Sequence, residues 1–237
     1  MPETVQRGYC PTDERDFQKQ LDTLEKAGND VYYLINRGYP IKSATEFVGN
    51  HYLLSERQRL ALARSISPET SILARKAKEL PHLPEGSTVH IDGFNTIISL
   101  EIAFSGSTLL LCMDGTVRDL AGLRGTYRLI DKTDMAIRAV RGVLEEEKVG
   151  VAHFALDAPV SNSGRLKAGI AEIMEDSPVQ VDFSVIPDVD RYLYKQEAVV
   201  TGDAIILDHC KSWFNLVRRA IDREIGDYPY VQIVKPL

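Results

Sequence analysis

The chain has 237 residues, of which 44% are hydrophobic and 26% charged, a composition typical of a soluble globular protein with one large or two small domains. With a formal net charge of -6, the field of the whole molecule repels nucleic acid unless a local basic patch or a metal ion overrides it. Three widely spaced cysteines, Cys10, Cys112 and Cys210, fit no zinc spacing and predict reduced thiols and a cytoplasmic location. No apolar run suits a signal peptide or a membrane span.

The first 80 residues predict a small helical domain. Apolar residues recur at helical spacing within 13–26, and further helical patterns follow in "NDVYYLINRGYP", "SATEFVGNHYL" and "SERQRLALARSI". Ser43 and Glu46 have the spacing of a capping box, and Ser55 is placed to cap the last of these helices.

After a linker at 81–86 that contains Pro81, Pro84 and Gly86, apolar runs rich in β-branched residues alternate with helical patterns. Continuous apolar strands separated by helices are typical of a parallel sheet that helices cover on both faces. We therefore predict a three-layer α/β domain with a mostly parallel sheet over 87–237, preceded by a helical domain over 1–80. The predicted strands are 88–92, 108–113, 151–156, 179–186 and 198–202, with an edge strand at 230–234, and the predicted helices are 96–104, 131–147, 163–175 and 209–225.

Four of the predicted strands end on an aspartate. A single such acid is most often the cap of the next helix, but the carboxyl ends of parallel strands meet at one edge of a sheet, so four of them should converge. Clustered carboxylates repel one another unless a cation lies between them, and oxygen ligands suit Mg²⁺ or Mn²⁺, which bridge to phosphate. The four residues are Asp92, Asp114, Asp157 and Asp203.

The neighbours of these acids fit such a site. Gly93 follows Asp92 directly and lets the backbone turn sharply beside a ligand. Asn95 orients the Asp92 carboxylate or contacts a substrate, or else it caps the following helix. Asp208 reaches the same edge if 204–208 is a tight turn. His209 lies beside it, and in such a place a histidine is more often structural than a base.

Two further segments carry candidate phosphate contacts. Ser161 and Ser163 precede a helix that bears Arg165, and free N–H groups at a helix N-terminus favour an anion. Arg118 and Arg124 lie in a loop rich in glycine and arginine, and guanidinium groups suit phosphate recognition. The alternatives are a serine-capped helix and a solvated loop.

The order and strand placement of these motifs resemble the PIN-like superfamily over residues from about 87 to 225, and the closest similarity is to its NYN branch of metal-dependent ribonucleases. The resemblance implies a Rossmann-like (PIN-like) fold in which Asp92 is the first metal ligand and Asn95 is the amide that accompanies it. Asp203 is similar to the acid of the late "GD" motif and Asp208 to the acid that follows it, although "AIILD" intervenes here. The middle acid stays open between Asp114 and Asp157, and Glu101 is an outside candidate.

The resemblance implies phosphodiester hydrolysis of RNA, in which bound Mg²⁺ or Mn²⁺ activates a water molecule and stabilises the leaving oxygen. The implied catalytic residues are Asp92, Asn95, Asp157 and Asp203, and the implied metal ligands are Asp92, Asp114, Asp157, Asp203 and Asp208. The alternative is a non-catalytic module that binds RNA or a nucleotide and retains the fold. A haloacid-dehalogenase-type phosphatase ranks low, because Phe94 stands where its second aspartate would be.

The helical N-terminus resembles an uncharacterised prokaryotic family that carries this domain pair, which implies no activity. Its basic residues and its tyrosines either present RNA or form a solvated face and a core. A homo-oligomer stays an open alternative. The basic residues are Arg57, Arg59, Arg64, Arg75, Lys76 and Lys78, and the tyrosines are Tyr32, Tyr33, Tyr39 and Tyr52.

Overall fold

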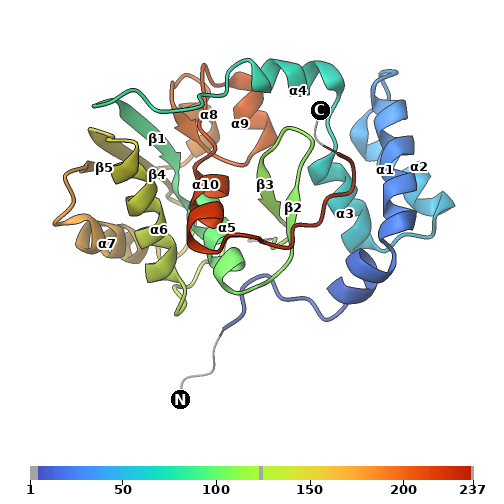
Figure 1. The fold of residues 1–237 in the computed structure, drawn as a ribbon, viewed down its shortest axis with the longest axis horizontal. Coiled ribbons are helices and arrows are strands. Elements are labelled where there is room, and N and C mark those ends of the chain that lie inside the picture. The colour runs from blue at the N-terminus through green and yellow to red at the C-terminus, as the bar shows by residue number, and fades with distance from the viewer. Residues whose placement is uncertain (1–4, 123–124, 236–237) are drawn as a thin grey trace. The chain divides into compact units, whose positions relative to one another are not determined.

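The computed structural model describes residues 5–122 and 125–235, which Figure 1 draws as a coloured ribbon. The chain forms two compact units, and it passes between them several times. The sheet unit consists of Met1–Arg7, Lys78–Gly106 and Ala121–Tyr228, as far as these residues are described. The helical unit consists of Gly8–Ala77, Ser107–Leu120 and the described part of Pro229–Leu237.

The sheet unit is built on four parallel strands in the order β5-β4-β1-β6. They are β1 (Thr88–Asp92), β4 (Val151–Asp157), β5 (Gln180–Ile186) and β6 (Val199–Val200). The mostly parallel sheet that the sequence predicts is therefore confirmed. In the register of β1 with β4, Asp92 lies opposite Ala155, so the ends of these strands share one edge of the sheet.

One face of this sheet is apolar. Val89 and Ile91 of β1 point to this face, together with Phe154 of β4, and all three are buried. Helices α5 (Gly93–Phe104), α6 (Thr133–Glu146), α7 (Ser163–Met174) and α10 (Leu216–Glu224) pack against one another beside it. Figure 1 shows α6 and α7 next to β4 and β5. Alternation along a strand explains why buried aliphatic side chains gather on one face.

The opposite face carries the alternate residues, and two short helices lie on it. Helices α8 (Val189–Leu193) and α9 (Ala204–His209) contact each other, and their apolar side chains cluster with Ala155 of β4. His90 and His153, on the same face, are only half-buried. The sheet unit thus has helices on both faces, and the short helices begin where two of its strands have ended.

The turn from β1 into α5 requires a glycine. A Cβ atom on Gly93 would lie 2.5 Å from Cδ2 of Leu156 and 3.0 Å from the carbonyl oxygen of Ala155. Both distances are shorter than van der Waals contact allows, so the chain turns closely against β4 only because Gly93 has no side chain. This close turn places Asp92 at the edge of the sheet.

The helical unit has one apolar core, which includes Phe17, Leu24, Leu62 and Ile72. It also contains a two-stranded antiparallel sheet. Its elements are the π-helical turn η1 (Glu14–Lys19), α1 (Leu21–Ile35), α2 (Ile41–His51), α3 (Glu56–Ser65), α4 (Glu69–Lys76), β2 (Leu109–Leu111) and β3 (Val117–Asp119).

The strand predicted at 108–113 exists, but its predicted place in the parallel sheet is wrong. It forms β2, which pairs in antiparallel fashion with β3, and Leu110 and Cys112 pack into the core of the helical unit. The sequence pattern of a buried apolar strand is the same whether helices of a parallel sheet or a separate helical core cover the strand. The predicted edge strand at 230–234 is a single bridge between Val231 and Leu110. Segments 107–120 and 229–235 thus lie with the helices rather than in the predicted α/β domain.

The expected helix starts have mixed outcomes. Ser55 caps α3 as predicted, since its hydroxyl accepts a hydrogen bond from the backbone N–H of Gln58 at 3.2 Å and Oε1 of Gln58 accepts one from the Ser55 N–H at 2.9 Å. The predicted capping box of Ser43 and Glu46 is wrong, because α2 already begins at Ile41. Among the described residues no helix has the length and apolar character to cross a membrane, and the three cysteines are free.

Candidate acidic site at the carboxyl edge of the sheet

Asp92 ends β1 and is buried, with 6% of its surface exposed. It occupies the N-cap position of α5, yet its side chain makes no capping hydrogen bond. Instead, Oδ2 accepts a hydrogen bond of 2.7 Å from the hydroxyl group of Thr201, which follows β6. The carboxylate of Asp92 is therefore directed at the edge of the sheet and not at the helix that it precedes.

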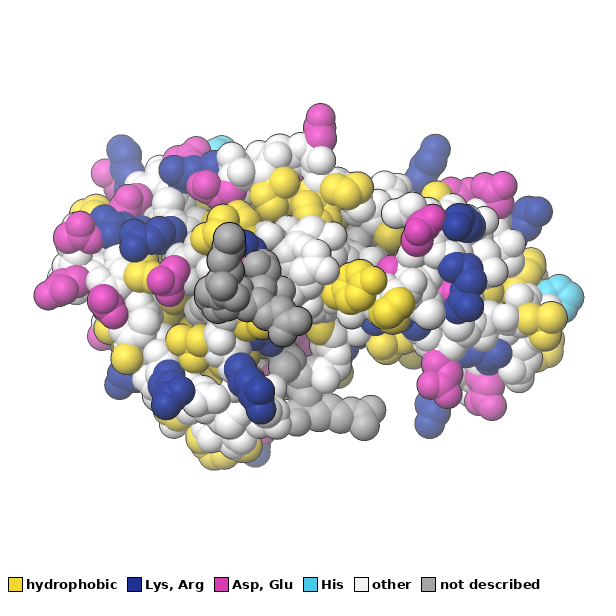
Figure 2. Space-filling view, turned by 90° about the horizontal axis from the view of Figure 1, so that it is seen from below, with side chains coloured by type: hydrophobic (Ala, Val, Ile, Leu, Met, Phe, Trp, Pro, Cys, Tyr) yellow, Lys and Arg dark blue, Asp and Glu magenta, His cyan; other side chains and the backbone are white. Residues whose placement is uncertain are grey.

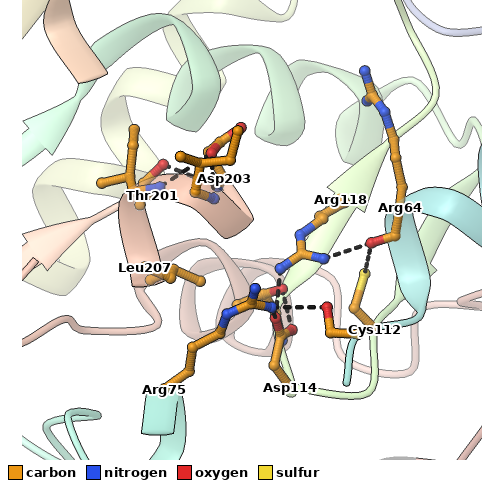
Figure 3. Close-up of polar contacts among 12 residues, drawn as sticks. Arg64, Arg75, Cys112, Asp114, Arg118, Thr201, Asp203 and Leu207 are labelled. Carbon is orange, nitrogen blue, oxygen red and sulfur yellow. Dashed lines mark hydrogen bonds and ion pairs between the residues drawn. The ribbon is translucent and has the colours of Figure 1, made fainter. Parts of the chain in front are cut away.

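Asn95 and Thr201 hold the segment after β6 in place. Oδ1 of Asn95 accepts a hydrogen bond of 2.7 Å from the backbone N–H of Gly202. The Thr201 hydroxyl, which donates to Asp92, also accepts one of 3.1 Å from the N–H of Asp203 (Figure 3). Asn95 therefore positions the backbone next to Asp203, rather than orienting the Asp92 carboxylate directly.

Asp203 caps α9, because its Oδ1 accepts hydrogen bonds from the backbone N–H groups of Ile205 at 2.7 Å and Ile206 at 3.2 Å. Asp203 thus has the common structural role of an acid at the end of a strand, which is to cap the next helix. The second carboxylate oxygen of Asp203 takes no part in that cap, and the side chain is only half-buried. Asp203 is consequently a cap that also contributes a negative charge to the edge.

Asp157 and Asp190 complete the group. Asp157 ends β4, and burial raises its pKa, although a hydrogen bond from the N–H of Val189 opposes this. Asp190 lies in the first turn of α8. Its pKa is also raised, mainly by burial and secondly by repulsion from Asp203 and Asp157. We call Asp92, Asp157, Asp190 and Asp203 the acidic site.

The buried member of the acidic site has the largest shift. Burial, followed by repulsion from Asp157, Asp203 and Asp190, raises the pKa of Asp92 to about 7, although the Thr201 hydrogen bond opposes the shift. At neutral pH a large share of the Asp92 carboxyl groups therefore carries a proton unless a cation compensates the charge.

Asp92 differs from the other buried acids of the described chain, because each of those has an arginine partner. Asp16 pairs with Arg15, Glu101 with Arg7, Asp114 with Arg75 and Arg118, Asp119 with Arg64, and Glu147 with Arg219. Within the described residues no lysine or arginine pairs with Asp92 or with the other members of the acidic site. A buried charge without a partner is costly, so Asp92 either stays protonated, as its raised pKa indicates, or takes a cation as its partner.

Oxygen donors of this kind suit a hard divalent cation. In the described part of the chain, no three His, Cys, Asp or Glu side chains are arranged to hold a metal ion by themselves. Mg²⁺ commonly takes only one or two carboxylates and completes its shell with water and substrate phosphate. The carboxylates of the acidic site have the donor chemistry for that mode of binding, in which Asp92 would be the desolvated ligand.

Asp208 does not follow the predicted geometry. The segment after Asp203 is helix α9 and not a tight turn, so five residues of helix turn the side chains of Asp203 and Asp208 in different directions. Asp208 is also not among the largest causes of the raised pKa of Asp92, whereas Asp157, Asp203 and Asp190 are. The far end of α9 is held by Lys78, whose Nζ donates to the carbonyl groups of Leu207 at 2.6 Å, Asp208 at 3.0 Å and Cys210 at 2.9 Å.

The prediction that Asp114 belongs to the sheet edge is wrong, because Asp114 lies between β2 and β3 in the helical unit. Its carboxylate is buried between the guanidinium groups of Arg75, at 2.7 Å, and Arg118 (Figure 3). Burial favours the neutral form, but Arg118, Thr116 and Arg75 outweigh it and lower the pKa of Asp114. Of the two candidates for the middle acid, only Asp157 lies at the edge of the parallel sheet.

Arg118 is not the exposed phosphate contact that the sequence predicts. It lies in β3, is buried, and donates to Asp114 and to the carbonyl oxygen of Arg64. The run of basic residues in α3 and α4 is also largely engaged within the helical unit, for Arg57 pairs with Asp13, Arg64 with Asp119 and Arg75 with Asp114. Arg124 lies outside the described residues.

The predicted anion site at the start of α7 is partly occupied by the protein itself. The hydroxyl of Ser161 accepts from the N–H of Tyr127 at 3.0 Å and donates to its carbonyl oxygen at 3.3 Å, so Ser161 anchors the loop that contains Tyr127. Ser163 is the first residue of α7, and Arg165 is exposed in its first turn. These two keep side chains that a phosphate group can approach.

Glu101 has structural contacts within the sheet unit. It is fully buried in α5, and its carboxylate accepts hydrogen bonds from the hydroxyl groups of Tyr127, at 2.8 Å, and Thr133. Nε of Arg7 lies 2.6 Å from its second oxygen, so the pair ties the N-terminal segment to the sheet unit. Burial nevertheless raises the pKa of Glu101.

Asp190 is not among the residues that the sequence predicts for the site, because β5 ends on Ile186 and not on an acid, and Asp190 follows only later, in "IPDVD". Extending the same rule, that residues after a parallel strand lie at the functional edge, to the first turn of the next helix would have found Asp188 and Asp190.

The fold and the acidic site define a mixed α/β protein with a parallel four-stranded sheet and a helical N-terminal region. Residues 82–219 match a family described as "Domain of unknown function (DUF5616)", and the chain belongs to this family. Residues 23–78 match a second one, described as "Protein of unknown function (DUF434)". The chain is 35% identical over 204 residues to an uncharacterised protein of Methanocaldococcus jannaschii, an alignment that covers 84% of this chain and 97% of that protein. No solved structure matches the chain.

Proposed function

We propose that the protein is a metal-dependent ribonuclease of the PIN-like, NYN type, whose acidic site holds Mg²⁺ or Mn²⁺ against a phosphodiester group of RNA. The observation that carries the proposal is Asp92, a buried carboxylate that caps no helix, has no arginine partner and is repelled by three other carboxylates. The helices on both faces of the parallel sheet support a Rossmann-like arrangement. We place the protein in the cytoplasm, in keeping with its free thiols.

The protein's own groups have separate roles in this proposal. Asp92 and Asp157 would provide ligand oxygens, and Asp190 and Asp203 would supply further negative charge. Thr201 and Asn95 are positioning residues, since both hold the segment that follows β6. When it is bound, the metal lowers the pKa of a water molecule and stabilises the leaving oxygen.

A metal ion also accounts for how an acidic protein attracts RNA. The net charge is -6, and on the face that Figure 2 shows, Lys and Arg side chains are interspersed with Asp and Glu among the residues drawn in colour. A phosphate group therefore meets no broad basic area on that face. At the acidic site no described lysine or arginine pairs with the carboxylates, so a divalent cation would be the main attraction there.

The test is cleavage of a labelled RNA that contains both a hairpin and single-stranded segments, with Mn²⁺, with Mg²⁺ and with EDTA. We expect metal-dependent cleavage that Asp92→Asn abolishes. Asp182→Asn is the matched control, because Asp182 is exposed on β5 of the same sheet and outside the acidic site. RNA binding without cleavage under any condition would favour the non-catalytic alternative, and the absence of both would overturn the assignment of RNA.

A further inference from the structure

We propose that Tyr194 and His209 form a stacking platform for an unpaired nucleobase, so that the acidic site acts on single-stranded segments of RNA. The proposal rests on the ribonuclease function above and adds the part of the substrate that lies beside the scissile phosphate. We refer to these two residues as the stacking platform.

The two rings of the platform lie parallel. Their centroids are 4.5 Å apart with an interplanar angle of 24°, so one ring covers a face of the other. Tyr194 is half-buried and packs against the apolar cluster that contains Val189 and Leu193, whereas His209 is exposed. Nδ1 of His209 lies 2.8 Å from the carbonyl oxygen of Ile205, which fixes the orientation of the ring. The platform is thus a supported aromatic surface with an exposed outer member.

The platform lies beside the acidic site. Tyr194 directly follows α8, which carries Asp190 in its first turn, and His209 ends α9, which Asp203 caps. Repulsion from Asp190 and Asp203 contributes, after burial, to a raised pKa of Tyr194. Helix α9 has six residues, and at about 1.5 Å per residue its two ends are ~9 Å apart. A nucleotide next to the bound phosphate spans such a distance.

A nucleobase fits this surface better than another partner does. Every base has a neutral π-face that stacks on aromatic rings, so binding tolerates any sequence. Phosphate groups are repelled by the carboxylates around Tyr194, so the neutral base, and not the backbone, is the part of the RNA that meets the platform. In a duplex both faces of a base are covered by its neighbours, so only an unpaired base presents a face to His209. The acidic site and the platform together therefore favour a single strand.

The test measures RNA binding and base stacking in the otherwise wild-type protein with Ca²⁺ in place of Mg²⁺, so that the acidic site keeps its carboxylates and an oxygen-binding cation while cleavage is avoided. The probe is a fluorescein-labelled 12-nucleotide single-stranded RNA of mixed sequence, and a second version carries 2-aminopurine. We expect Tyr194→Leu and His209→Gln each to weaken binding about 10- to 100-fold and to abolish the quenching of 2-aminopurine. Tyr194→Phe should retain both signals, because it keeps the ring.

Two comparisons make the result decisive. Tyr9→Leu is the control, since Tyr9 is an exposed tyrosine of the helical unit, and the same RNA annealed to its complement should bind more weakly than the single strand. Circular dichroism checks that both variants are folded. If Tyr194→Leu and His209→Gln then bound RNA as tightly as the unsubstituted protein, the platform would be overturned. Metal-dependent cleavage by the wild type would still support the ribonuclease. Equal binding of the duplex would overturn the preference for single strands. A wild type that neither binds nor cleaves RNA would overturn both proposals.

Discussion

Oδ2 of Asp92 accepts a 2.7 Å hydrogen bond from the hydroxyl of Thr201, although 109 residues separate the two in the chain. The contact exists because β1 and β6 are neighbours in the sheet, which brings the two strand ends together. The same hydroxyl accepts a hydrogen bond from the backbone N–H of Asp203. One threonine thus joins the first and the last acid of the site.

Thr201→Val should weaken the site without changing its shape, because valine replaces the hydroxyl by a methyl group. The Thr201 hydrogen bond lowers the pKa of Asp92, so its loss should raise that pKa and move the rise of the cleavage rate to higher pH. The free energy of unfolding should fall by ~1–2 kcal/mol, since the N–H of Asp203 loses its acceptor. A pH–rate profile and urea denaturation measure the two effects. Thr201→Ser keeps the hydroxyl and should keep the wild-type pH–rate profile and free energy of unfolding. A valine variant with an unshifted pH–rate profile would show that the Thr201 hydroxyl does not tune Asp92.

Asp92→Asn should stabilise the metal-free protein at neutral pH. The pKa of Asp92 is about 7 in the folded protein against 3.8 for an ordinary aspartate carboxyl. The bound proton therefore stabilises the wild type fully below pH 3.8, and this stabilisation is lost as the pH rises to 7. At about 1.4 kcal/mol per pKa unit, the variant should avoid a loss of up to ~4 kcal/mol. Urea denaturation in EDTA between pH 4 and pH 8 measures the difference, and equal pH slopes for both proteins would count against the buried, uncompensated carboxylate.

How far the sequence predicts the site depends on what defines each residue. Asp92, Asp157 and Asp203 were found because an acid after a parallel strand lies at one edge, whatever packs around it. Asp114 follows an equally apolar run, yet that run is covered by the helices of the helical unit, to which it belongs, and no local pattern distinguishes the two environments. Asp190 can be predicted once α8 is placed directly after β5. Whether a carboxylate has an arginine partner depends on residues distant in sequence, such as Arg75, and is visible only in the structure.

Asp114→Asn should have the opposite effect to Asp92→Asn, although both replace a buried aspartate. The carboxylate of Asp114 lies between Arg75 and Arg118, and its removal leaves two guanidinium groups facing each other in a buried place. Breaking a buried ion pair from one side costs ~3–5 kcal/mol. Thermal and urea denaturation at pH 7 should show the loss, with or without Mg²⁺. A variant as stable as the wild type would show that the arginines do not depend on this carboxylate.

Gly93→Ala tests whether the close turn between β1 and α5 sets the position of Asp92. The added Cβ would lie 2.5 Å from Cδ2 of Leu156 and 3.0 Å from the backbone oxygen of Ala155. The side chain can move but the carbonyl of β4 cannot, so the start of α5 must shift, at a cost of ~1–3 kcal/mol. The shift moves Asp92, and metal-dependent cleavage should fall by more than the loss of folded protein explains.

Gly164→Ala is the matched control, because that glycine lies in α7 with no atom near its added Cβ. Alanine there should stabilise the helix by up to ~1 kcal/mol and leave cleavage unchanged. Denaturation curves and initial rates on the same preparations separate the two outcomes. If Gly93→Ala were as stable and as active as Gly164→Ala, the turn would tolerate a side chain, and the position of Asp92 would depend instead on its hydrogen bond with Thr201.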